Sequence, residues 1–303
     1  MSESAEGQAR SSASVQRPLL LGRHSFSPDR RLVMAIVNRT PDSFYDKGRT
    51  YELRSALQRV HEVVAAGADL VDIGGVKAGP GEDVPADEEI RRTADLIAAT
   101  REAYPDLVIS VDTYRHEVAD AACEAGADLI NDAWGGVDRK LLEVAAEREV
   151  ALVCTHAGGL PPRTRPHRVS YDDVMADILD RTIKLAALAV EAGVDRDRIL
   201  LDPGHDFGKN TRHSLEASRR LGELVASGWP VLVSLSNKDF IGETLDLTLG
   251  ERLYGTLAAT AVSAWQGARM FRVHEVRETR QVLDMVSSIQ GHRPPARTIR
   301  GLA

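Results

Sequence analysis

The chain has little cysteine, no long apolar run and no apolar leader. Only two of its 303 residues are cysteines, Cys123 and Cys154, and their separation fits neither a disulfide framework nor a metal-binding pair. No stretch approaches the roughly 20 consecutive apolar residues of a membrane helix. The first residues, MSESAEGQARSSASVQRP, lack the apolar core of a secretory signal. We therefore expect a cytoplasmic protein without a membrane partner.

Positive charge is not in excess either. The 38 Lys and Arg residues are outnumbered by 45 Asp and Glu residues, which gives a formal net charge of −7. Proteins that bind nucleic acids usually carry a basic patch or stripe. The charge balance therefore argues against nucleic acid as a partner.

The chain divides into a long central region and two polar ends. Residues 1–18 are rich in Ser, Ala, Gln and Glu and cannot bury enough apolar surface to offset the entropy of ordering. Residues 292–303 contain two prolines and three arginines. We predict a disordered tail at 1–18, a single domain at 19–291 and a C-terminal tail at 292–303.

One pattern recurs through the central region. An apolar-periodic stretch ends at a glycine and a short branched run follows, as in AAGADLVDIGG (65–75). Glycine is favoured where a helix ends because it reaches the left-handed conformation without a Cβ clash. Nearly continuous apolar runs are typical of strands buried on both faces of a parallel sheet. Eight runs fit this description: 32–37, 69–73, 107–111, 127–130, 150–154, 199–201, 231–235 and 269–273.

The spacing of these runs predicts an α/β fold with a closed sheet. Helical stretches separate them at 53–66, 86–103, 116–125, 139–148, 173–192, 213–227 and 249–266. Strand–helix alternation implies right-handed crossovers and a parallel sheet, and eight repeats match a (β/α)8 TIM barrel. The alternative is an open, doubly wound sheet. No G-x-G-x-x-G follows the first run, which argues against its dinucleotide-binding version.

Polar residues follow the predicted strands, where barrel active sites lie. A lone Asp after a strand is often the N-cap of the next helix, and we expect this role for Asp132 and Asp172. For Asp112, Asn131 and Asp202 together, we favour a functional role. The polar residues near the ends of the eight runs are Asn38, Asp72, Asp112, Asn131, Thr155 with His156, Asp202, Ser236 with Lys238, and Arg272 with His274.

The types of these side chains match two kinds of ligand group. The acceptors and donors of Asp112, Asn131, Asp202 and Lys238 suit a flat heterocycle with amidine-like N–H groups. Three others suit an anion, with or without a divalent metal; they are Asn38, Arg272 and His274. Arg272 and His274 are two residues apart on a strand, so both face the same side.

Six stretches that carry these residues resemble the dihydropteroate synthase family. They cover essentially the whole predicted barrel in the family's order, and the combination of N-x-T-P-D-S-F, D-P-G-x-x-F-G-K and R-V-H-x-V is highly specific. The stretches are MAIVNRTPDSFYDKG (34–48), GADLVDIGG (67–75), SVDTYRHEVADAACEAGADLINDAWGG (110–136), DPGHDFGKN (202–210), SNKDFIGETL (236–245) and RVHEV (272–276).

The resemblance implies a reaction and a pterin site. Members join a dihydropterin methyl diphosphate to 4-aminobenzoate and release pyrophosphate. By resemblance, Asp112, Asn131, Asp202 and Lys238 hold the pterin ring. Fixed cations would stabilise the negative charge that grows on the leaving diphosphate, and no covalent enzyme nucleophile is required.

The resemblance also implies sites for the other groups. Asn38 would bind Mg²⁺ and, with Arg272 and His274, the diphosphate. Phe207 and Ser236, together with Lys238, would border the aminobenzoate pocket. In an active enzyme, Lys238 and Arg272 would be the catalytic residues.

The second loop departs from the family pattern. Active members read GGESTRPG where this chain reads GGVKAGPG, residues 74–81. The flanking glycines and proline suggest that the loop keeps its course. The threonine hydroxyl and the arginine, which in the family contact the aminobenzoate region and the diphosphate, are lost at Ala78 and Gly79. Lys77 supplies a charge but not the bidentate fork of an arginine.

Smaller departures point the same way. Arg39 follows Asn38 where a small apolar residue is usual, and Asn237 replaces an arginine. Asp206 replaces a glycine and is expected to place a carboxylate near an anionic substrate. Thr155-His156-Ala157 replaces Met-His-Met and is expected to alter the wall of the pterin cavity.

These features resemble a second, paralogous branch of the family in actinobacteria that is regarded as lacking synthase activity. We favour an inactive or very weakly active pterin-binding protein. The first alternative is an active synthase of folate biosynthesis. Further alternatives are a pterin-binding methyltransferase that uses a folate methyl donor and an enzyme with a different phosphorylated substrate.

Two other segments have open roles. Residues 158–171, GGLPPRTRPHRVSY, form either a solvated basic loop or an anion clamp that replaces the lost arginine. The stretch 249–266 carries the small residues Gly255, Ala258, Ala259, Ala261 and Ala264. This surface either packs on the barrel alone or forms a homodimer contact, as the family resemblance implies.

Overall fold

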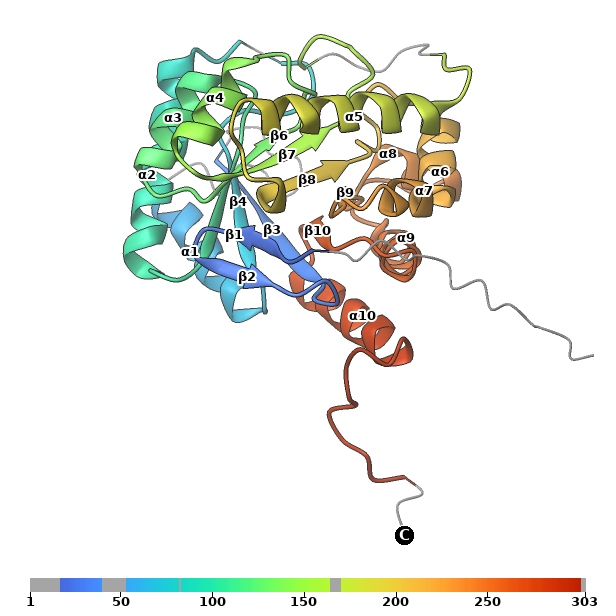
Figure 1. The fold of residues 1–303 in the computed structure, drawn as a ribbon. Coiled ribbons are helices and arrows are strands. Elements are labelled where there is room, and N and C mark those ends of the chain that lie inside the picture. Colours follow the sequence, from blue (N-terminus) through green and yellow to red (C-terminus); the bar gives the residue numbers. More distant parts are fainter. Residues whose placement is uncertain (1–16, 40–52, 82, 164–169, 301–303) are drawn as a thin grey trace, which may run out of the picture.

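The computed structural model describes residues 17–39, 53–81, 83–163 and 170–300. Eight parallel strands form one sheet in the order β8-β7-β6-β5-β4-β3-β10-β9, with helices on its outer side (Figure 1). The predicted (β/α)8 TIM barrel is confirmed. The strands are β3 (Leu32–Asn38), β4 (Leu70–Gly74), β5 (Val108–Asp112), β6 (Leu129–Asp132), β7 (Ala151–Thr155), β8 (Ile199–Asp202), β9 (Leu232–Ser234) and β10 (Met270–Val273).

Helices follow each strand, with small differences from the prediction. The stretch 213–227 is two helices, α6 and α7, and the segment after β9 contains α8 as well as α9. The helices are α1 (Leu53–Ala65), α2 (Ala86–Ala103), α3 (His116–Glu124), α4 (Lys140–Glu147), α5 (Val174–Glu191), α6 (Thr211–Arg219), α7 (Leu221–Ala226), α8 (Asp239–Leu245), α9 (Leu253–Trp265) and α10 (Val276–Ile289), with a 3-10 turn, η1, at Arg196–Arg198.

The barrel closes between β8 and β9, the first and last strands in the order of the sheet. A parallel bridge pairs Leu201 of β8 with Val231 just before β9, and the backbone N–H of Leu201 donates to the carbonyl of Pro230 at 2.9 Å. Other neighbours share three to five paired positions, as between β4 and β5. The β8–β9 contact is therefore the narrowest seam of the sheet.

Side-chain alternation separates two cores. Residues such as Leu70, Leu129 and Leu200 form a cluster inside the barrel. Their neighbours along the strands, such as Val71 and Ile130, pack outward in a larger cluster with the helices. Since strand side chains alternate between faces, this division fixes which polar residues face the interior.

A hairpin that the sequence did not predict covers the amino ends of the strands. It consists of β1 (Leu19–Leu21) and β2 (His24–Phe26), and Leu19 and Leu21 join the interior cluster with no exposed surface. The buried Arg269 donates to the carbonyls of Arg17, Phe26 and Ser27 at 2.9 to 3.0 Å. The hairpin therefore closes the end of the barrel opposite the predicted active site.

The two chain ends of the barrel lie near each other. Nδ1 of His292, after α10, is 3.9 Å from a carboxylate oxygen of Asp29, before β3. Residues 292–300 contain no helix or strand and extend away from the barrel (Figure 1). Most of the predicted tail at 1–18 lies outside the described residues.

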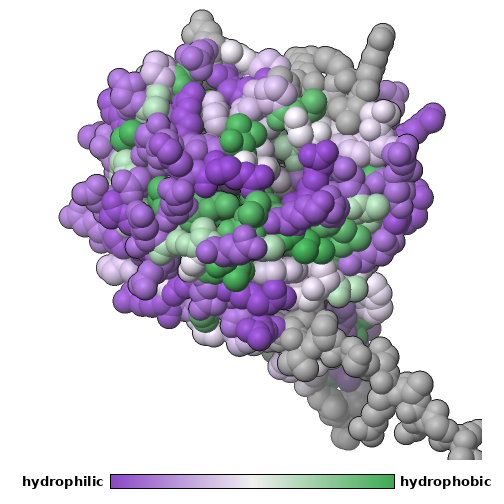
Figure 2. Space-filling view, turned by 45° about the horizontal axis from the view of Figure 1, so that its top comes forward, coloured by the Kyte–Doolittle hydropathy of each residue, from purple (hydrophilic) through white to green (hydrophobic). Residues whose placement is uncertain are grey.

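The surface is largely hydrophilic with local apolar areas. Figure 2 shows one face on which hydrophobic residues gather in a band across the middle, with hydrophilic residues around them. Among the described residues, no helix combines the length and the apolar character needed to span a membrane. Cys123 and Cys154 are both free thiols.

Candidate functional site

Polar side chains line the interior at the carboxyl ends of the strands. Asp72 follows the interior residue Leu70 by two positions, and Asp112 follows the interior residue Val108 by four, so both face inward. The same alternation applies to the other strands. We call the inward-facing polar residues at these ends the mouth residues: Asn38, Asp72, Asp112, Asn131, Thr155, Asp202, Ser236, Arg272 and His274.

Arg272 spans the mouth from β10 to β4 and β5. Its Nε donates to Oδ2 of Asp72 at 2.5 Å, and its Nη2 donates to Oδ2 of Asp112 at 2.6 Å. Nδ2 of Asn131 and Oγ of Ser110 also donate to Asp72, at 3.2 and 2.6 Å. Asp72 is fully buried and was not predicted as a ligand-binding residue. Its signal in the sequence was a carboxylate inside an otherwise apolar strand.

Burial shifts the protonation of the mouth residues. It raises the pKa of Asp112 to about 7, although the Arg272 charge opposes the rise. Burial also raises the pKa of Asp202 to about 6. Burial lowers the pKa of Arg272, but the carboxylates of Asp72 and Asp112 outweigh this effect, so the guanidinium stays charged. An anion that binds Arg272 must compete with both carboxylates.

Asp202 ends β8, Phe207 lies in the loop after it, and Lys238 follows β9, the strand next to β10. Oδ1 of Asp202 accepts a hydrogen bond from the backbone N–H of Gly204 at 2.7 Å. Nζ of Lys238 is 4.4 Å from the ring centre of Phe207, at cation–π distance. The Trp134 ring lies nearly perpendicular to the Phe207 ring, with ring centres 5.0 Å apart. The structure thus brings Phe207 and Lys238 together.

Ser236 joins two residues after β10. Its Oγ lies 2.9 Å from Nδ1 of His274 and donates to Oε2 of Glu275 at 2.9 Å. Burial lowers the pKa of His274 to about 3, so the imidazole is neutral at pH 7. Neutral His274 can stabilise an anion only as a hydrogen-bond donor.

Asn38 ends β3 beside Gly74 of β4. A Cβ placed on Gly74 would lie 3.2 Å from Oδ1 of Asn38 and 3.6 Å from Cβ of Asp112. Glycine at this position therefore lets the carboxamide approach the mouth carboxylates closely.

Both predicted helix caps were wrong in detail. Asp132 accepts hydrogen bonds from the backbone N–H groups of Trp134 and Gly136, at 3.0 and 2.6 Å, and so holds a turn. The cap of α5 is Asp173 rather than Asp172, and it accepts from the backbone N–H groups of Met175 and Ala176. Local sequence places such a cap only to within a residue or two.

Asp206 caps a helix, a role that the sequence did not predict. Its Oδ2 accepts from the backbone N–H groups of Asp239 and Phe240, at 2.7 and 3.3 Å, at the start of α8. Oγ of Ser214 donates to its Oδ1 at 3.1 Å. The residue has φ +65°, which glycine adopts without strain. The expected carboxylate near a substrate is therefore engaged with the protein.

Arg39 and Asn237 also turn to the protein. Nη1 of Arg39 donates to the carbonyls of Arg91 and Arg92 in α2, at 3.3 and 3.1 Å. Asn237 has φ +58°; its backbone carbonyl accepts from Nη1 of Arg252 at 2.8 Å, and its side-chain Nδ2 donates to Oε1 of Glu275 at 3.4 Å.

The last residue of β7 and the residue after it face different ways, one toward the mouth and one toward a buried cluster. Thr155 faces inward, and its Oγ is buried without a hydrogen-bond partner among the described residues. His156 instead contacts Nζ of Lys209 through Nδ1 at 2.6 Å and Asp177 through Nε2 at 2.7 Å. Lys209 was not predicted as a site residue. The one cation within the glycine-rich stretch DPGHDFGKN was the signal for it.

The substituted loop, residues 74–81, lies beside α2 and the basic segment after β7. Nη1 of Arg92 donates to the carbonyl of Gly75 at 3.0 Å. A Cβ on Gly81 would lie 2.9 Å from Nη2 of Arg163, whose Nε is buried without a partner among the described residues. The Arg163 charge also acts on the buried Glu89. Arg165, His167 and Arg168 lie outside the described residues.

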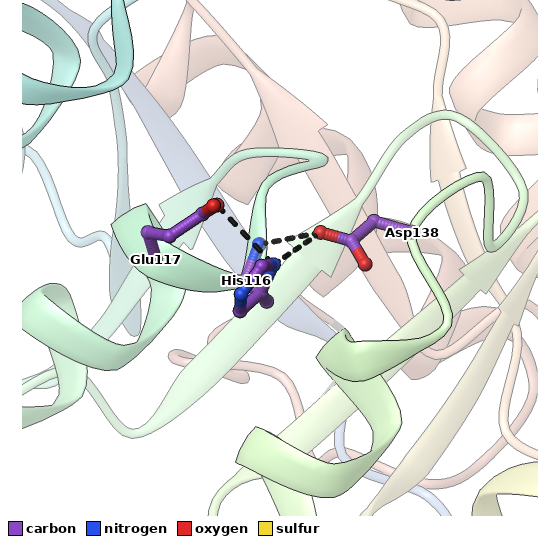
Figure 3. A group of neighbouring side chains, drawn as sticks. All are labelled: His116, Glu117 and Asp138. Carbon is purple, nitrogen blue, oxygen red and sulfur yellow. Dashed lines mark hydrogen bonds and ion pairs between the residues drawn. The ribbon is translucent and has the colours of Figure 1, made fainter.

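One group of described His, Cys, Asp and Glu side chains is close enough to hold a metal ion. Its ligand atoms, from His116, Glu117 and Asp138, lie within 4.8 Å of one another (Figure 3). Oδ2 of Asp138 accepts from the backbone N–H of His116 at 2.9 Å, and its Oδ1 accepts from that of Lys140 at 3.2 Å. This carboxylate links the starts of α3 and α4, so capping explains the group, and none of its members is a mouth residue.

Comparison with known proteins gives consistent matches over this region. Residues 34–274 match the family model described as "Pterin binding enzyme". The chain is 61% identical over 279 residues to "Inactive dihydropteroate synthase 2" of Mycobacterium tuberculosis, covering 91% of this chain and 88% of that protein. It is 40% identical over 264 residues to "Dihydropteroate synthase" of Bacillus subtilis, covering 86% and 89%.

A solved structure shares the fold. The dihydropteroate synthase of Xanthomonas albilineans with 4-aminobenzoic acid superposes with a TM-score of 0.82 at 35% sequence identity. The match covers 91% of this chain and 98% of that one. The match therefore extends over nearly the whole of both chains.

Proposed function

The chain belongs to the family of pterin-binding enzymes that includes the dihydropteroate synthases, and on this premise we propose that it binds a pterin at the barrel mouth but has little or no synthase activity. The observation that carries the proposal is a contrast within the site. The residues assigned to the pterin ring, Asp112, Asn131, Asp202 and Lys238, are all present. The chemical groups of the second loop are not.

The retained residues support ring binding through complementary hydrogen bonds. Asp202 offers a buried carboxylate and Asp112 a half-buried one for N–H groups, and Asn131 offers both a donor and an acceptor. Burial raises the pKa values of the two aspartates to about 7 and about 6. A ligand that donates hydrogen bonds to the ionised carboxylates binds better as the pH rises through this range.

The substituted loop explains the loss of the reaction. Departure of the diphosphate builds up negative charge, and each preorganised donor removed from such a site costs roughly 10²–10³ in rate. Val76, Ala78 and Gly79 have no side-chain donor, and Asn237 replaces a further arginine of the family pattern. Ring binding makes no comparable use of these groups, so it is the step that survives.

Two measurements test the proposal. Calorimetry with 6-hydroxymethylpterin should give saturable binding, and Asp202→Ala should weaken it by about 1–3 kcal/mol. Absence of binding by the folded protein would refute a pterin site. In a turnover assay, dihydropteroate formation should be near background, whereas a rate typical of working synthases would favour the alternative of an active enzyme.

A five-site variant tests the cause of inactivity. Val76→Glu, Lys77→Ser, Ala78→Thr and Gly79→Arg, combined with Asn237→Arg, restore the missing groups. Turnover should rise about 10²-fold or more, and more than pterin affinity does, because these groups act on the transition state. A folded variant without any gain would place the fault elsewhere, with Arg39 and the Thr155–Ala157 wall as the next candidates.

A second candidate function is action on a different phosphorylated substrate. Arg163 favours it, because the basic segment after β7 brings a guanidinium against the substituted loop at Gly81. This cation comes from a different strand end than the lost arginine of the second loop, so it would hold an anion in a different position.

Mg²⁺ is the proposed metal, with Asn38 as its protein ligand. Asn38 supplies one neutral oxygen, and Mg²⁺ keeps several waters and commonly binds through substrate phosphates. The carboxylates of Asp72 and Asp112 are engaged by Arg272. Asn38 therefore fits a metal that arrives with a diphosphate better than a permanently bound ion. When bound, Mg²⁺ would neutralise the charge of that diphosphate.

We also propose a cytoplasmic homodimer that uses small molecules as its ligands. Exposed apolar side chains support the dimer: Tyr254, Val262 and Trp265 on α9, with Met285 and Ile289 on α10. Of the small residues of the stretch, Ala264 is buried and Ala259 and Ala261 pack on the core, which is the first of the two alternatives, packing on the barrel. Two free thiols suit a reducing compartment.

A further inference from the structure

Lys209 is a buried cation that contacts the loops after two strands. Its side chain is about as buried as any in the core, with 1% of the residue exposed. Nζ lies 2.6 Å from Nδ1 of His156 and donates to the His156 carbonyl at 3.2 Å. It also donates to the carbonyls of Gly204 and Phe207, both at 3.0 Å. One ammonium group thus joins the loop after β7 to the loop after β8.

The loop after β8 carries two of the assigned ligand residues. Asp202 stands at its start, with Oδ1 bound to the backbone N–H of Gly204, and Phe207 lies under Lys238. Lys209 holds the carbonyls of Gly204 and Phe207. It therefore fixes the backbone between Asp202 and Phe207 at two points.

His156 and Asp177 support Lys209 from outside. Nε2 of His156 lies 2.7 Å from Oδ2 of Asp177 on α5, which also accepts from Nε of Arg181 at 2.9 Å. Contact with a carboxylate at Nε2 sets the ring so that Nδ1 is the free acceptor for Lys209. The Tyr171 hydroxyl donates to the carbonyl of Gly208 at 2.6 Å and ties the same loop down.

The charge of Lys209 also acts on Asp202. Burial lowers the pKa of Lys209 to about 7, while the Asp202 charge opposes the fall. Conversely, the Lys209 charge helps to keep the pKa of Asp202 from rising further. The titratable groups that interact with Lys209 are His156, Asp177, Asp202, His205, Asp206, His213 and Lys238.

We propose that Lys209 is a positioning residue that holds the loop after β8, and with it Asp202 and Phe207, in the arrangement that binds a pterin. The chain Asp177–His156–Lys209 connects this position to helix α5. This inference rests on the proposed pterin site, and it concerns a residue that would not touch the ligand.

Lys209→Met removes the ammonium group and keeps much of the side-chain volume. We expect 6-hydroxymethylpterin to bind the variant about tenfold more weakly at pH 6. The difference in pterin affinity between the parent protein and the variant should become smaller above pH 7, because Lys209 of the parent protein then loses its charge. Hydrogen exchange of the backbone amides of residues 204–208 should be faster in the variant.

Arg269→Met is the matched control. Arg269 is also 1% exposed and also donates to three backbone carbonyls, but at the amino end of the barrel. It should lower the melting temperature while leaving pterin affinity and exchange at 204–208 unchanged. Asp177→Ala provides a second test in case the Lys209→Met protein does not fold. It removes the carboxylate that holds His156 from α5 and should weaken pterin binding several-fold.

Three results would overturn the proposal. The first is a folded Lys209→Met protein with parental affinity and parental exchange. The second is a loss of affinity in both methionine variants that follows their melting temperatures at every pH. If the parent protein binds no pterin, the proposed function fails, but hydrogen exchange still tests the role of Lys209. Faster exchange at residues 204–208 in Lys209→Met, and not in Arg269→Met, supports the positioning role. Unchanged exchange in Lys209→Met is the third contrary result.

Discussion

At the scale of single residues, the two protonation states of Asp202 favour different properties: the ionised carboxylate favours pterin binding and the neutral acid favours stability. Its pKa in the folded protein, about 6 because of burial, lies above the ordinary value of roughly 3.9. The folded state therefore favours the neutral acid. The stability that this preference contributes is fully present below about pH 4 and is lost as the pH rises through about 6.

Asp202→Asn should separate the two effects. At pH 8 the variant should be more stable by about 1–3 kcal/mol, because no buried charge has to form, and Oδ1 can still accept from Gly204. At pH 4 the two proteins should be equally stable. Urea unfolding at both pH values measures this, and an equal gain at both would contradict the assignment. Pterin affinity should fall at pH 8 by about tenfold.

Arg163 is the residue that distinguishes the two candidate functions. Arg163→Ala should weaken binding of inorganic pyrophosphate about tenfold, because a charged partner is lost, and should leave 6-hydroxymethylpterin binding unchanged. Calorimetry with each ligand measures both. Arg23→Ala changes the same charge in the hairpin at the other end of the barrel. Equal pyrophosphate affinity in both variants would mean that Arg163 binds no anion at the mouth.

The sequence predicted which strand ends carry the mouth residues, but not how these residues pair. Alternation along a strand is enough to place Asp112 or Asn131 inside the barrel. The Arg272 contacts to Asp72 and Asp112 reach strands two and three positions away in the sheet, and the Lys209 contacts join two loops. Such partners depend on closure of the barrel, which no local pattern encodes.

At the scale of elements, the β1–β2 hairpin stabilises the barrel from the end opposite the site. Leu19 and Leu21 complete the interior cluster with Leu32 and Met270. Among the residues that the structure describes, the side-chain hydrogen bonds of the hairpin go to residues outside the mouth, such as Pro105, Asp106 and Arg269. Stability and ligand binding are therefore supported from opposite ends.

Leu21→Ala tests this division. The truncation leaves a cavity beneath a fully buried position, and it should lower the free energy of unfolding by about 2–5 kcal/mol. Pterin affinity should not change. Chemical unfolding and calorimetry on the same sample measure both quantities. Weakened binding at full folding would show that the amino end of the barrel influences the mouth.

The strands were predicted better than the hairpin for a physical reason. A strand buried on both faces leaves a continuous apolar run, and β5 and β7 begin and end within one residue of the predicted runs. The hairpin strands have three residues each, too few for any period to show. The break between α6 and α7 at Arg220 is likewise poorly marked, because the nearest glycine, Gly222, lies inside α7 and not at the break.

At the scale of the whole molecule, the exposed face of α9 and α10 is the proposed dimer surface. Tyr254 is 84% exposed and Trp265 is 58% exposed. Nε2 of Gln290, after α10, donates to the carbonyl of Trp265 at 3.3 Å, which joins the ends of the two helices. Large apolar side chains that are exposed together commonly mark an interface.

Val262→Asp should convert the dimer to a monomer, because it would bury a charge in the apolar interface. Light scattering after size-exclusion chromatography measures the mass. Leu188→Asp, on the exposed side of α5, introduces the same charge away from this face and should leave the mass unchanged. A parent protein that is already monomeric would remove the basis for the dimer.

The proximity of His292 to Asp29 and the narrow seam between β8 and β9 together make the starting point of the chain arbitrary. A linker long enough to join residue 292 to residue 17, which lies beside η1 through the Arg17–Asp197 ion pair, would keep the hairpin in place, and new ends at the turn between α7 and β9 would open the backbone where the sheet is held by one bridge. Circular permutants are tolerated where termini are close and the cut spares buried residues, which in this turn means a cut at Ser227 or Gly228, before the buried Trp229. The eight βα units form a closed ring, so a chain that begins at a different unit could form the same barrel.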